Sequence, residues 1–270
     1  GHIYVAGRQG KVLCLLAKKG TALWTHEAKS SVEGGLTLFG DSIFIATEAG
    51  SIHRLDKKSG KLLWKSKGAS QCVAAPVVDG ERVYVGDIGG LFLAYSLADG
   101  KKLWEFRTGN KIVAAAAISG NYVFVPGMDE HRYALARKRG VVPWRKSLGS
   151  IPGGMTVIEG LSTIPGGRPR SLLYAALTKK EKYLLLCANS RSGATLWTAS
   201  LPTEVQGQPA VSEGRVYVGG TDGKIYCFNA DDGTKLWSMN TGSEIRGGPA
   251  TTETAVLVAN YHGSLYRVED

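Results

Sequence analysis

Six tryptophans recur at a regular interval along this chain of 270 residues, and that interval constrains the fold more than any other feature. They are Trp24, Trp64, Trp104, Trp144, Trp197 and Trp237. Successive tryptophans lie 40 residues apart, except that 53 residues separate Trp144 from Trp197. A glycine stands four positions before each: Gly20, Gly60, Gly100, Gly140, Gly193 and Gly233. A fixed period of this length indicates a repeat architecture.

Each repeat contains four short segments with strand character, as residues 43–78 show clearly. Apolar segments at 43–45 and 52–55 are separated by a glycine turn, and a second glycine turn leads to a segment that ends in Leu-Trp. A polar stretch follows, and then a segment of small residues at 74–78. Short runs of β-branched and aromatic residues are typical of strands. Four strands in 40 residues, without helical periodicity, predict the blades of a β-propeller.

The composition of the segments predicts their order within a blade. Strands crowd together near the axis of a propeller, so we expect the small-residue strand to be innermost. We expect the Trp strand to be outermost, where a ring that buries about 150–250 Å² covers the gap to the next blade. All six tryptophans are therefore predicted to be structural blade-docking residues.

The repeat count predicts an all-β, seven-bladed β-propeller of four-stranded antiparallel blades, with residues 1–270 as a single domain. The chain holds seven copies of the first two strands but six Trp strands and six small-residue strands. The first copy begins at Ile3 and the last reaches Asp270 without a further Trp strand. One inner strand and one Trp strand upstream of Gly1 would complete a mixed seventh blade. Eight blades remain the alternative if more terminal sequence belongs to the protein.

The cysteines follow the same repeat. Cys14, Cys187 and Cys227 each precede their Trp by ten residues, so they occupy one position on different blades. Equivalent positions on different blades are too far apart for a disulfide. We therefore predict that these thiols and Cys72 are free and structural.

No pattern in the chain specifies a chemical reaction. The sequence has no Cys-x-x-Cys, no His-Glu-x-x-His and no phosphate-binding glycine loop before a helix. Its five histidines, His2, His26, His53, His131 and His262, are scattered through several repeats. The fourth repeat has Asp129, Glu130 and His131 where others have a glycine turn; these residue types bind metals, but three adjacent residues rarely converge on one ion. We predict no catalytic residue and no metal ligand.

The docking segments resemble the quinoprotein-type (PQQ-like) β-propeller repeat. The resemblance rests on Lys-Lys-Ser-Gly-Lys-Leu-Leu-Trp at 57–64 and Ala-Asp-Asp-Gly-Thr-Lys-Leu-Trp at 230–237, and it extends over essentially the whole chain. Enzymes with this repeat bind a quinone and calcium beneath a vicinal cysteine pair. This chain has no adjacent cysteines and is much shorter, so the resemblance implies the non-catalytic branch, without a cofactor. Non-catalytic relatives include an outer-membrane assembly lipoprotein and bacterial sensor domains, which implies a bacterial, periplasmic or other extracytoplasmic protein.

The predicted ligand-binding positions lie in the loops between each Trp strand and the next inner strand, around the channel mouth. Counting from each Trp gives seven polar candidates for a polar ligand or a peptide. They are Glu33, Gln71, Lys111, Glu204, Gln206, Glu244 and Arg246. The alternative is that these side chains face only solvent.

The opposite face carries much of the basic excess of a chain with a net charge of +10. Basic residues recur in its turns: Lys18-Lys19, Lys57-Lys58 and Arg137-Lys138-Arg139, with the insertion at 165–170 nearby. Acidic residues dilute this charge, and no aromatic residues alternate with it for base stacking. Such a face could meet nucleic acid or an anionic membrane. Nucleic acid is not a predicted partner, and a solvated basic face is the simpler interpretation.

These observations favour a non-enzymatic scaffold that binds a protein or peptide, as an assembly or sensor module. The alternatives are a small polar ligand at the channel mouth, as in a vestigial quinoprotein, and a quinoprotein-like oxidoreductase, which the residues favour least. No apolar run approaches the length of a transmembrane segment. No signal peptide is visible at Gly1, so the sequence itself assigns no location.

Overall fold

The computed structural model describes residues 1–68, 70–161, 170–252 and 254–269, and every regular element in these ranges is a β-strand. The chain forms two compact units. The first unit comprises Gly1–Ala116 with Lys138–Gly140, and the second comprises Ala117–Arg137 with Val141–Asp270. Of the insertion predicted around 165–170, residues 165–169 lie outside the described residues.

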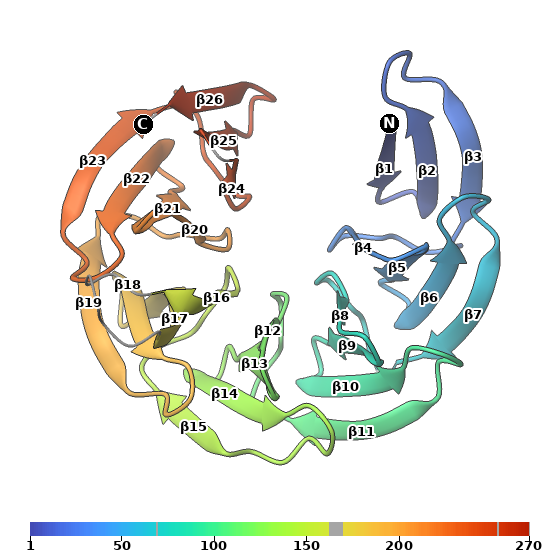
Figure 1. Ribbon diagram of the computed structural model, residues 1–270, viewed down its shortest axis with the longest axis horizontal. Coiled ribbons are helices and arrows are strands. Elements are labelled where there is room, and N and C mark those ends of the chain that lie inside the picture. Colours follow the sequence, from blue (N-terminus) through green and yellow to red (C-terminus); the bar gives the residue numbers. More distant parts are fainter. Residues whose placement is uncertain (69, 162–169, 253, 270) are drawn as a thin grey trace. The chain divides into compact units, whose positions relative to one another are not determined.

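The first unit holds three antiparallel sheets whose strands follow one another in sequence (Figure 1). The first sheet is β1 (His2–Ala6), β2 (Lys11–Leu16) and β3 (Ala22–Glu27). The second is β4 (Leu36–Phe39), β5 (Ser42–Ala46), β6 (Ser51–Asp56) and β7 (Leu62–Lys67). The third is β8 (Val77–Val78), β9 (Arg82–Gly86), β10 (Leu91–Ser96) and β11 (Lys102–Arg107).

The second unit holds four sheets with the same strand order. The first two are β12 (Ala117–Ser119), β13 (Tyr122–Pro126), β14 (His131–Ala136) and β15 (Trp144–Ser147), then β16 (Met155–Leu161), β17 (Arg170–Lys179), β18 (Lys182–Asn189) and β19 (Thr195–Leu201). The last two are β20 (Ala210–Ser212), β21 (Arg215–Gly219), β22 (Lys224–Asn229) and β23 (Lys235–Asn240), then β24 (Ala250–Thr251), β25 (Ala255–Ala259) and β26 (Leu265–Glu269).

This arrangement confirms the predicted all-β, seven-bladed propeller fold. Within the described ranges, five sheets have four strands, and the first and last have three. The six small-residue strands, from β4 to β24, occupy one edge of their sheets, and the six Trp strands, from β3 to β23, occupy the other. Hydrogen bonds join neighbouring inner strands, as from Thr37 Oγ1 to the Pro76 carbonyl at 2.5 Å. Small side chains permit this close approach.

The hydrophobic core lies between successive sheets. In the first unit, Phe44 and Ile52 of one sheet pack with Val83 and Tyr95 of the next, and all four are essentially fully buried. In the second unit, Tyr174 and Tyr226 belong to a similar cluster between two sheets. Each sheet is therefore stabilised mainly by burial of apolar area against its neighbours.

The tryptophans lie between one sheet and the next. Trp64 lies beside Phe44 of its own sheet, with ring centroids 6.1 Å apart. Its indole N–H donates a hydrogen bond to the carbonyl of Leu97 in the next sheet at 3.0 Å. Gly100, at φ +71°, covers the ring so closely that a Cβ there would lie 2.7 Å from Trp64 Cε3. This position therefore requires a residue that has no side chain and tolerates positive φ.

The cysteines are buried and free, and they lie where the repeat places them. Cys14 pairs across the strands with Trp24, Cys187 with Trp197 and Cys227 with Trp237. Cys72 instead lies in a loop, where burial raises the pKa of its thiol to about 12. All four therefore act as small apolar residues of the core.

Because of the docking contact, we expect two glycine substitutions to lower the free energy of unfolding by different amounts. Gly20 also has positive φ, at +65°, but a Cβ added there would meet no atom within 4 Å, whereas Gly100 faces the Trp64 ring. We expect Gly20→Ala to cost about 1 kcal/mol for its backbone conformation alone, and Gly100→Ala to cost roughly 1–3 kcal/mol more because of overpacking. Urea denaturation of both variants measures the difference. Equal costs would show that the turn does not depend on the ring.

Removal of a docking ring is expected to lower the free energy of unfolding by more than either glycine substitution. We expect Trp64→Ala to lower the free energy of unfolding by roughly 3–5 kcal/mol, because it removes a large ring and leaves a cavity between two sheets. Leu63 is the control, since it is the preceding residue on the same strand and its side chain is 51% exposed. Leu63→Ala is expected to shift the denaturation midpoint little. A normal midpoint in Trp64→Ala would contradict the docking role.

Candidate functional site

The loops that carry the predicted ligand-binding residues are fastened by a repeated pair of backbone hydrogen bonds. In the first unit, the Cys72 N–H donates to the Thr47 carbonyl of its own sheet at 3.3 Å, and the Gln71 carbonyl accepts from Ile88 of the next sheet at 2.9 Å. The second unit repeats this pattern, with Ile245 N–H to the Gly220 carbonyl at 3.0 Å and Tyr261 N–H to the Glu244 carbonyl at 2.8 Å.

A buried side chain anchors each of these loops beside the hydrogen bonds. Val32, Cys72, Ile112, Val205 and Ile245 are each at most 3% exposed. Each follows its Trp by eight residues, so it directly adjoins the polar positions predicted from the sequence. The loop backbones are therefore held in place, and the neighbouring polar side chains project from a fixed support.

Most of the predicted side chains form local pairs. In the first unit, Glu33 lies 3.4 Å from Arg8, and the Gln71 amide donates to Glu48 at 2.6 Å, whereas Lys111 is exposed. In the second unit, the Gln206 amide donates to Glu204 at 3.2 Å, and the Arg246 guanidinium donates to Glu244 at 2.8 Å. The structure thus places all seven residues on the loops, and the paired ones meet within one loop or at an adjoining turn.

One of these pairs extends to an exposed aromatic ring that the sequence did not single out. Tyr261 lies in the turn between β25 and β26 and is 66% exposed. The Arg246 guanidinium carbon lies 4.5 Å from the centre of its ring, within cation–π range. Glu244 Oε2 lies 2.8 Å from Nη2 of the same guanidinium. Glu244, Arg246 and Tyr261 therefore form an ordered surface cluster, which we call the Arg–Tyr cluster.

The position of Tyr261 within the repeat could have identified it. It is the second residue of the turn after the first strand, where other repeats place Arg8, Glu48 and Thr221. Its N–H bonds to the preceding loop in the same way as Glu48 and Thr221 bond to theirs. An aligned comparison of turns and loops therefore predicts that Tyr261 and the polar loop residues meet.

Neighbouring sheets also bring two histidines together, although they belong to different repeats. His26 Nε2 of β3 lies 3.4 Å from His53 Nδ1 of β6, with the rings edge to face. His53 Nε2 lies 3.1 Å from Ser51 Oγ, which in turn bonds Thr47 Oγ1 at 2.8 Å. Burial first, and then the charges of Lys65 and His26, lower the pKa of His53 from 6.5 to about 4. The pair is therefore a neutral polar contact between two sheets.

The unusual turn of the fourth repeat has structural partners. Asp129 accepts hydrogen bonds from the Tyr133 hydroxyl and from the His131 backbone N–H, the latter at 3.2 Å. His131 Nδ1 lies 2.8 Å from the carbonyl oxygen of Asp129. Asp222 makes the same contacts with Tyr226 and Lys224 in another repeat. No cluster of three or more metal-ligating side chains occurs among the residues that the structure describes.

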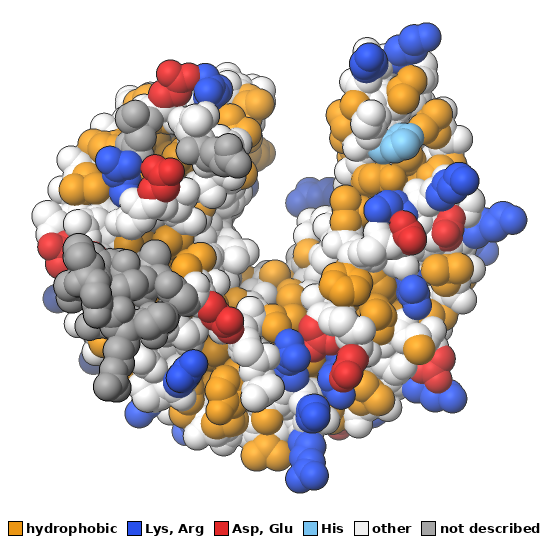
Figure 2. All heavy atoms as spheres, viewed as in Figure 1, with side chains coloured by type: hydrophobic (Ala, Val, Ile, Leu, Met, Phe, Trp, Pro, Cys, Tyr) orange, Lys and Arg blue, Asp and Glu red, His pale blue; other side chains and the backbone are white. Residues whose placement is uncertain are grey.

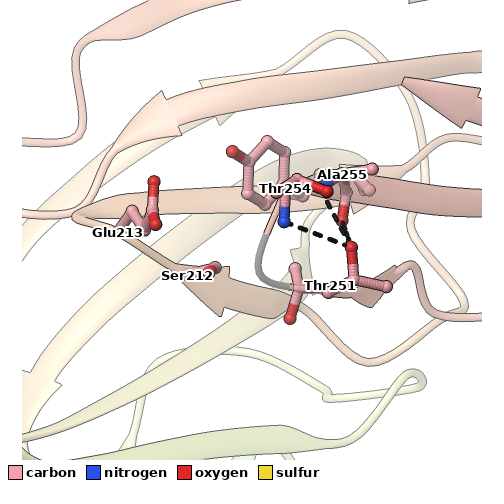
Figure 3. Close-up of a pocket in the computed structure, with 8 residues that line it drawn as sticks. Ser212, Glu213, Thr251, Thr254 and Ala255 are labelled. Atoms are coloured by element: carbon pink, nitrogen blue, oxygen red, sulfur yellow. Dashed lines mark hydrogen bonds between the residues drawn. The ribbon is translucent and has the colours of Figure 1, made fainter. Parts of the chain in front are cut away.

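Two hollows in the second unit are lined mainly by small and polar residues. A pocket of about 230 Å³ lies between the β20–β21 and β24–β25 turns, where Ser212, Glu213 and Thr251 face it (Figure 3). A hollow of about 460 Å³ runs along the inner strands beside Thr156 and Gln208. Gln208 Nε2 already donates to the Met155 carbonyl at 2.8 Å, and Thr156 Oγ1 donates to that of Pro209 at 2.5 Å. These polar groups therefore serve contacts between strands.

The fold is a β-propeller, and a family match over most of the chain identifies its repeats as PQQ-like. The family described as "Outer membrane protein assembly factor BamB" matches residues 8–167 and 181–270, and the chain belongs to this family. No curated protein matches the sequence significantly. In the described ranges, no helix is long and apolar enough to cross a membrane.

Three solved structures show the same fold. BamB from Moraxella catarrhalis is 24% identical, with a TM-score of 0.80 over 99% of this chain and 79% of that one. The computationally designed Ika8 protein is 17% identical, with a TM-score of 0.84 over 98% and 80% of the two chains. Quinohemoprotein alcohol dehydrogenase from Comamonas testosteroni is 12% identical, with a TM-score of 0.62 over 96% and 68%.

The buried histidine predicts a loss of stability in acid. Because the pKa of His53 is about 4 in the folded chain and 6.5 when unfolded, the unfolded state binds more protons between these values. This contribution is complete above pH 6.5 and declines as the pH falls toward 4, by roughly 3 kcal/mol in total. Urea denaturation between pH 7.5 and 4.5 should show the decline.

Two variants separate this effect from general acid sensitivity. His53→Leu is expected to flatten the pH dependence, because Leu13 and Leu93 occupy the same position in neighbouring repeats. His262→Gln, at an exposed position, should retain the full dependence. If His53→Leu and the unmodified chain lose stability in parallel, His53 is not the titrating group.

Proposed function

We propose that this chain is a non-enzymatic scaffold that binds a protein or peptide partner during outer-membrane protein assembly, outside the cytoplasm. Membership of the BamB family supports this proposal, because the family is described by that assembly role. We also propose that residues 1–270 act as one domain. The exposed side chains of the loops supply the binding surface. The loop backbones are already held in place, so they need not reorganise when the partner binds.

The Arg–Tyr cluster is the observation that carries the proposal. Tyr and Arg are enriched among the residues that dominate binding energy at protein interfaces. Tyr261 offers an exposed ring, and Glu244 and the ring together hold the Arg246 guanidinium in position. An ordered anchor of this kind loses little side-chain entropy when a partner covers it. The remaining predicted loop residues would make polar contacts with the partner. They are Glu33, Gln71, Lys111, Glu204 and Gln206.

The partner can be identified by photo-crosslinking in cells. A photoreactive amino acid at position 261 is expected to capture an outer-membrane assembly protein, whereas the same group at Leu236, on an outer strand, is not. Mass spectrometry identifies the captured protein. Equal capture at both positions, or capture of unrelated proteins alone, would contradict the proposal.

The contribution of the cluster can then be measured with the purified partner. We expect Arg246→Ala and Tyr261→Ala each to weaken binding by about 2 kcal/mol, or roughly thirtyfold, as at interface hot spots. Asp231→Ala provides the control, because Asp231 is an exposed residue of the same unit in the turn at 230–233, at the other end of the sheets. Unchanged affinity in both cluster variants, with unchanged thermal stability, would remove the Arg–Tyr cluster from the interface.

A further inference from the structure

Positive charge is concentrated in the first unit. That unit contains 18 Lys and Arg against 10 Asp and Glu, an excess of eight. The second unit contains 15 against 13, an excess of two. The proposed partner-binding cluster lies in the second unit, so this charge calls for a separate explanation.

Much of the excess lies in the turns that enter the Trp strands. These turns carry six exposed basic residues, which we call the basic turn surface: Lys18, Lys19, Lys58, Lys61, Lys138 and Arg139. Among the described residues, none of these six side chains forms an ion pair or a hydrogen bond. The corresponding turn at 230–233 in the second unit carries Asp231 and Asp232 instead.

Docking fixes the backbone of two of these turns. Gly60 is seated on Trp24 and Gly140 on Trp104, where an added Cβ would lie 2.5 and 2.6 Å from the rings. Gly20, after Lys18-Lys19, makes no such contact. The basic turn surface is therefore an array of exposed cations, of which Lys58, Lys61, Lys138 and Arg139 lie beside a docked glycine.

Nearby acidic groups neutralise only part of this array. Asp41 lies 4.0 Å from Lys57, and Asp99 lies 3.0 Å from Lys101, so each has a basic partner outside the array. Asp56 accepts the Ser59 N–H at 2.7 Å within its own turn. A positive surplus remains for an external anion.

Exposed apolar side chains adjoin the same turns. Leu62 and Leu63, directly after Lys61, are 46% and 51% exposed, and Phe39 is 38% exposed. Lys57 Nζ donates to the Gly40 carbonyl at 2.6 Å, which holds the turn after Phe39 against the turn that carries Lys58. Figure 2 shows Lys, Arg and hydrophobic side chains interspersed over the strands of the first unit. Cations and apolar groups therefore share one surface.

We propose that the basic turn surface binds the anionic surface of a lipid bilayer, with Lys and Arg at the headgroups and Phe39, Leu62 and Leu63 at the acyl boundary. Basic residues interspersed with apolar ones are typical of interfacial membrane binding. Single-stranded nucleic acid would require aromatic rings for successive bases. In the described part of the first unit, Phe39 is the sole exposed Phe, Tyr or Trp.

Vesicle sedimentation of the 270-residue chain tests this proposal. We expect binding to vesicles that contain phosphatidylglycerol, little binding to pure phosphatidylcholine, and weakening at high salt. The combined variant Lys58→Ser, Lys61→Ser, Lys138→Ser should bind about a hundredfold more weakly, given the typical attraction of each basic side chain to an anionic membrane. Phe39→Ser should weaken the binding that persists at high salt.

The matched control removes three charges from elsewhere, in the combined variant Lys11→Ser, Lys111→Ser, Lys224→Ser. These lysines are exposed and lie at the loop end of their sheets, so this variant should retain most vesicle binding. Equal losses in the two triple variants, or equal binding to both lipid compositions, would overturn the proposal. So would tighter binding to heparin or single-stranded DNA than to anionic vesicles. Arg246→Ala should leave vesicle binding unchanged, so this result is independent of the proposed partner site.

Discussion

The contact between a tryptophan ring and the glycine turn of the next sheet is the interaction on which the rest of the structure depends. Three elements hold each of the rings of Trp24, Trp64, Trp144 and Trp197: an aromatic residue of the same sheet, a backbone carbonyl of the next sheet, and a glycine without a side chain. For Trp197 these are Tyr174, the Ala230 carbonyl at 3.0 Å and Gly233. Because one residue from each sheet must be present, the contact fixes the spacing of the sheets, and it is kept across the 53-residue interval, where Gly193 covers Trp144.

At the other end of the sheets, a different interaction joins one sheet to the next. There the loops are joined to two successive turns by backbone hydrogen bonds, and a buried anchor such as Ile245 fills the space beneath. Backbone bonds place few demands on the side chains next to the anchor. Those positions can therefore vary, and loop residues on a rigid support are well suited to binding. The Arg–Tyr cluster occupies such positions.

The sequence predicted the strands and their order within each sheet, because both follow from the repeat. It also placed Glu244 and Arg246 on the correct loop. It did not identify Tyr261 or the contact between His26 and His53, because these depend on which residues of neighbouring sheets face each other. His26 and His53 occupy different strands of successive repeats, so the 40-residue alignment never compares them directly. Their proximity arises from the packing of one sheet on the next.

The two ends of the sheets differ in which residue positions can vary without disturbing the contacts between sheets. In the turns that enter the Trp strands, docking fixes the glycine, while the two residues directly before it, Lys58-Ser59 in one turn and Asp231-Asp232 in another, remain exposed. Lys57-Lys58-Ser59-Gly60 and Ala230-Asp231-Asp232-Gly233 form the same docking contact with opposite charge. Charge can thus change from sheet to sheet without loss of the contact that holds the sheets together. The concentration of cations in the first unit is therefore not a requirement of the fold, and it is better explained by what that surface meets.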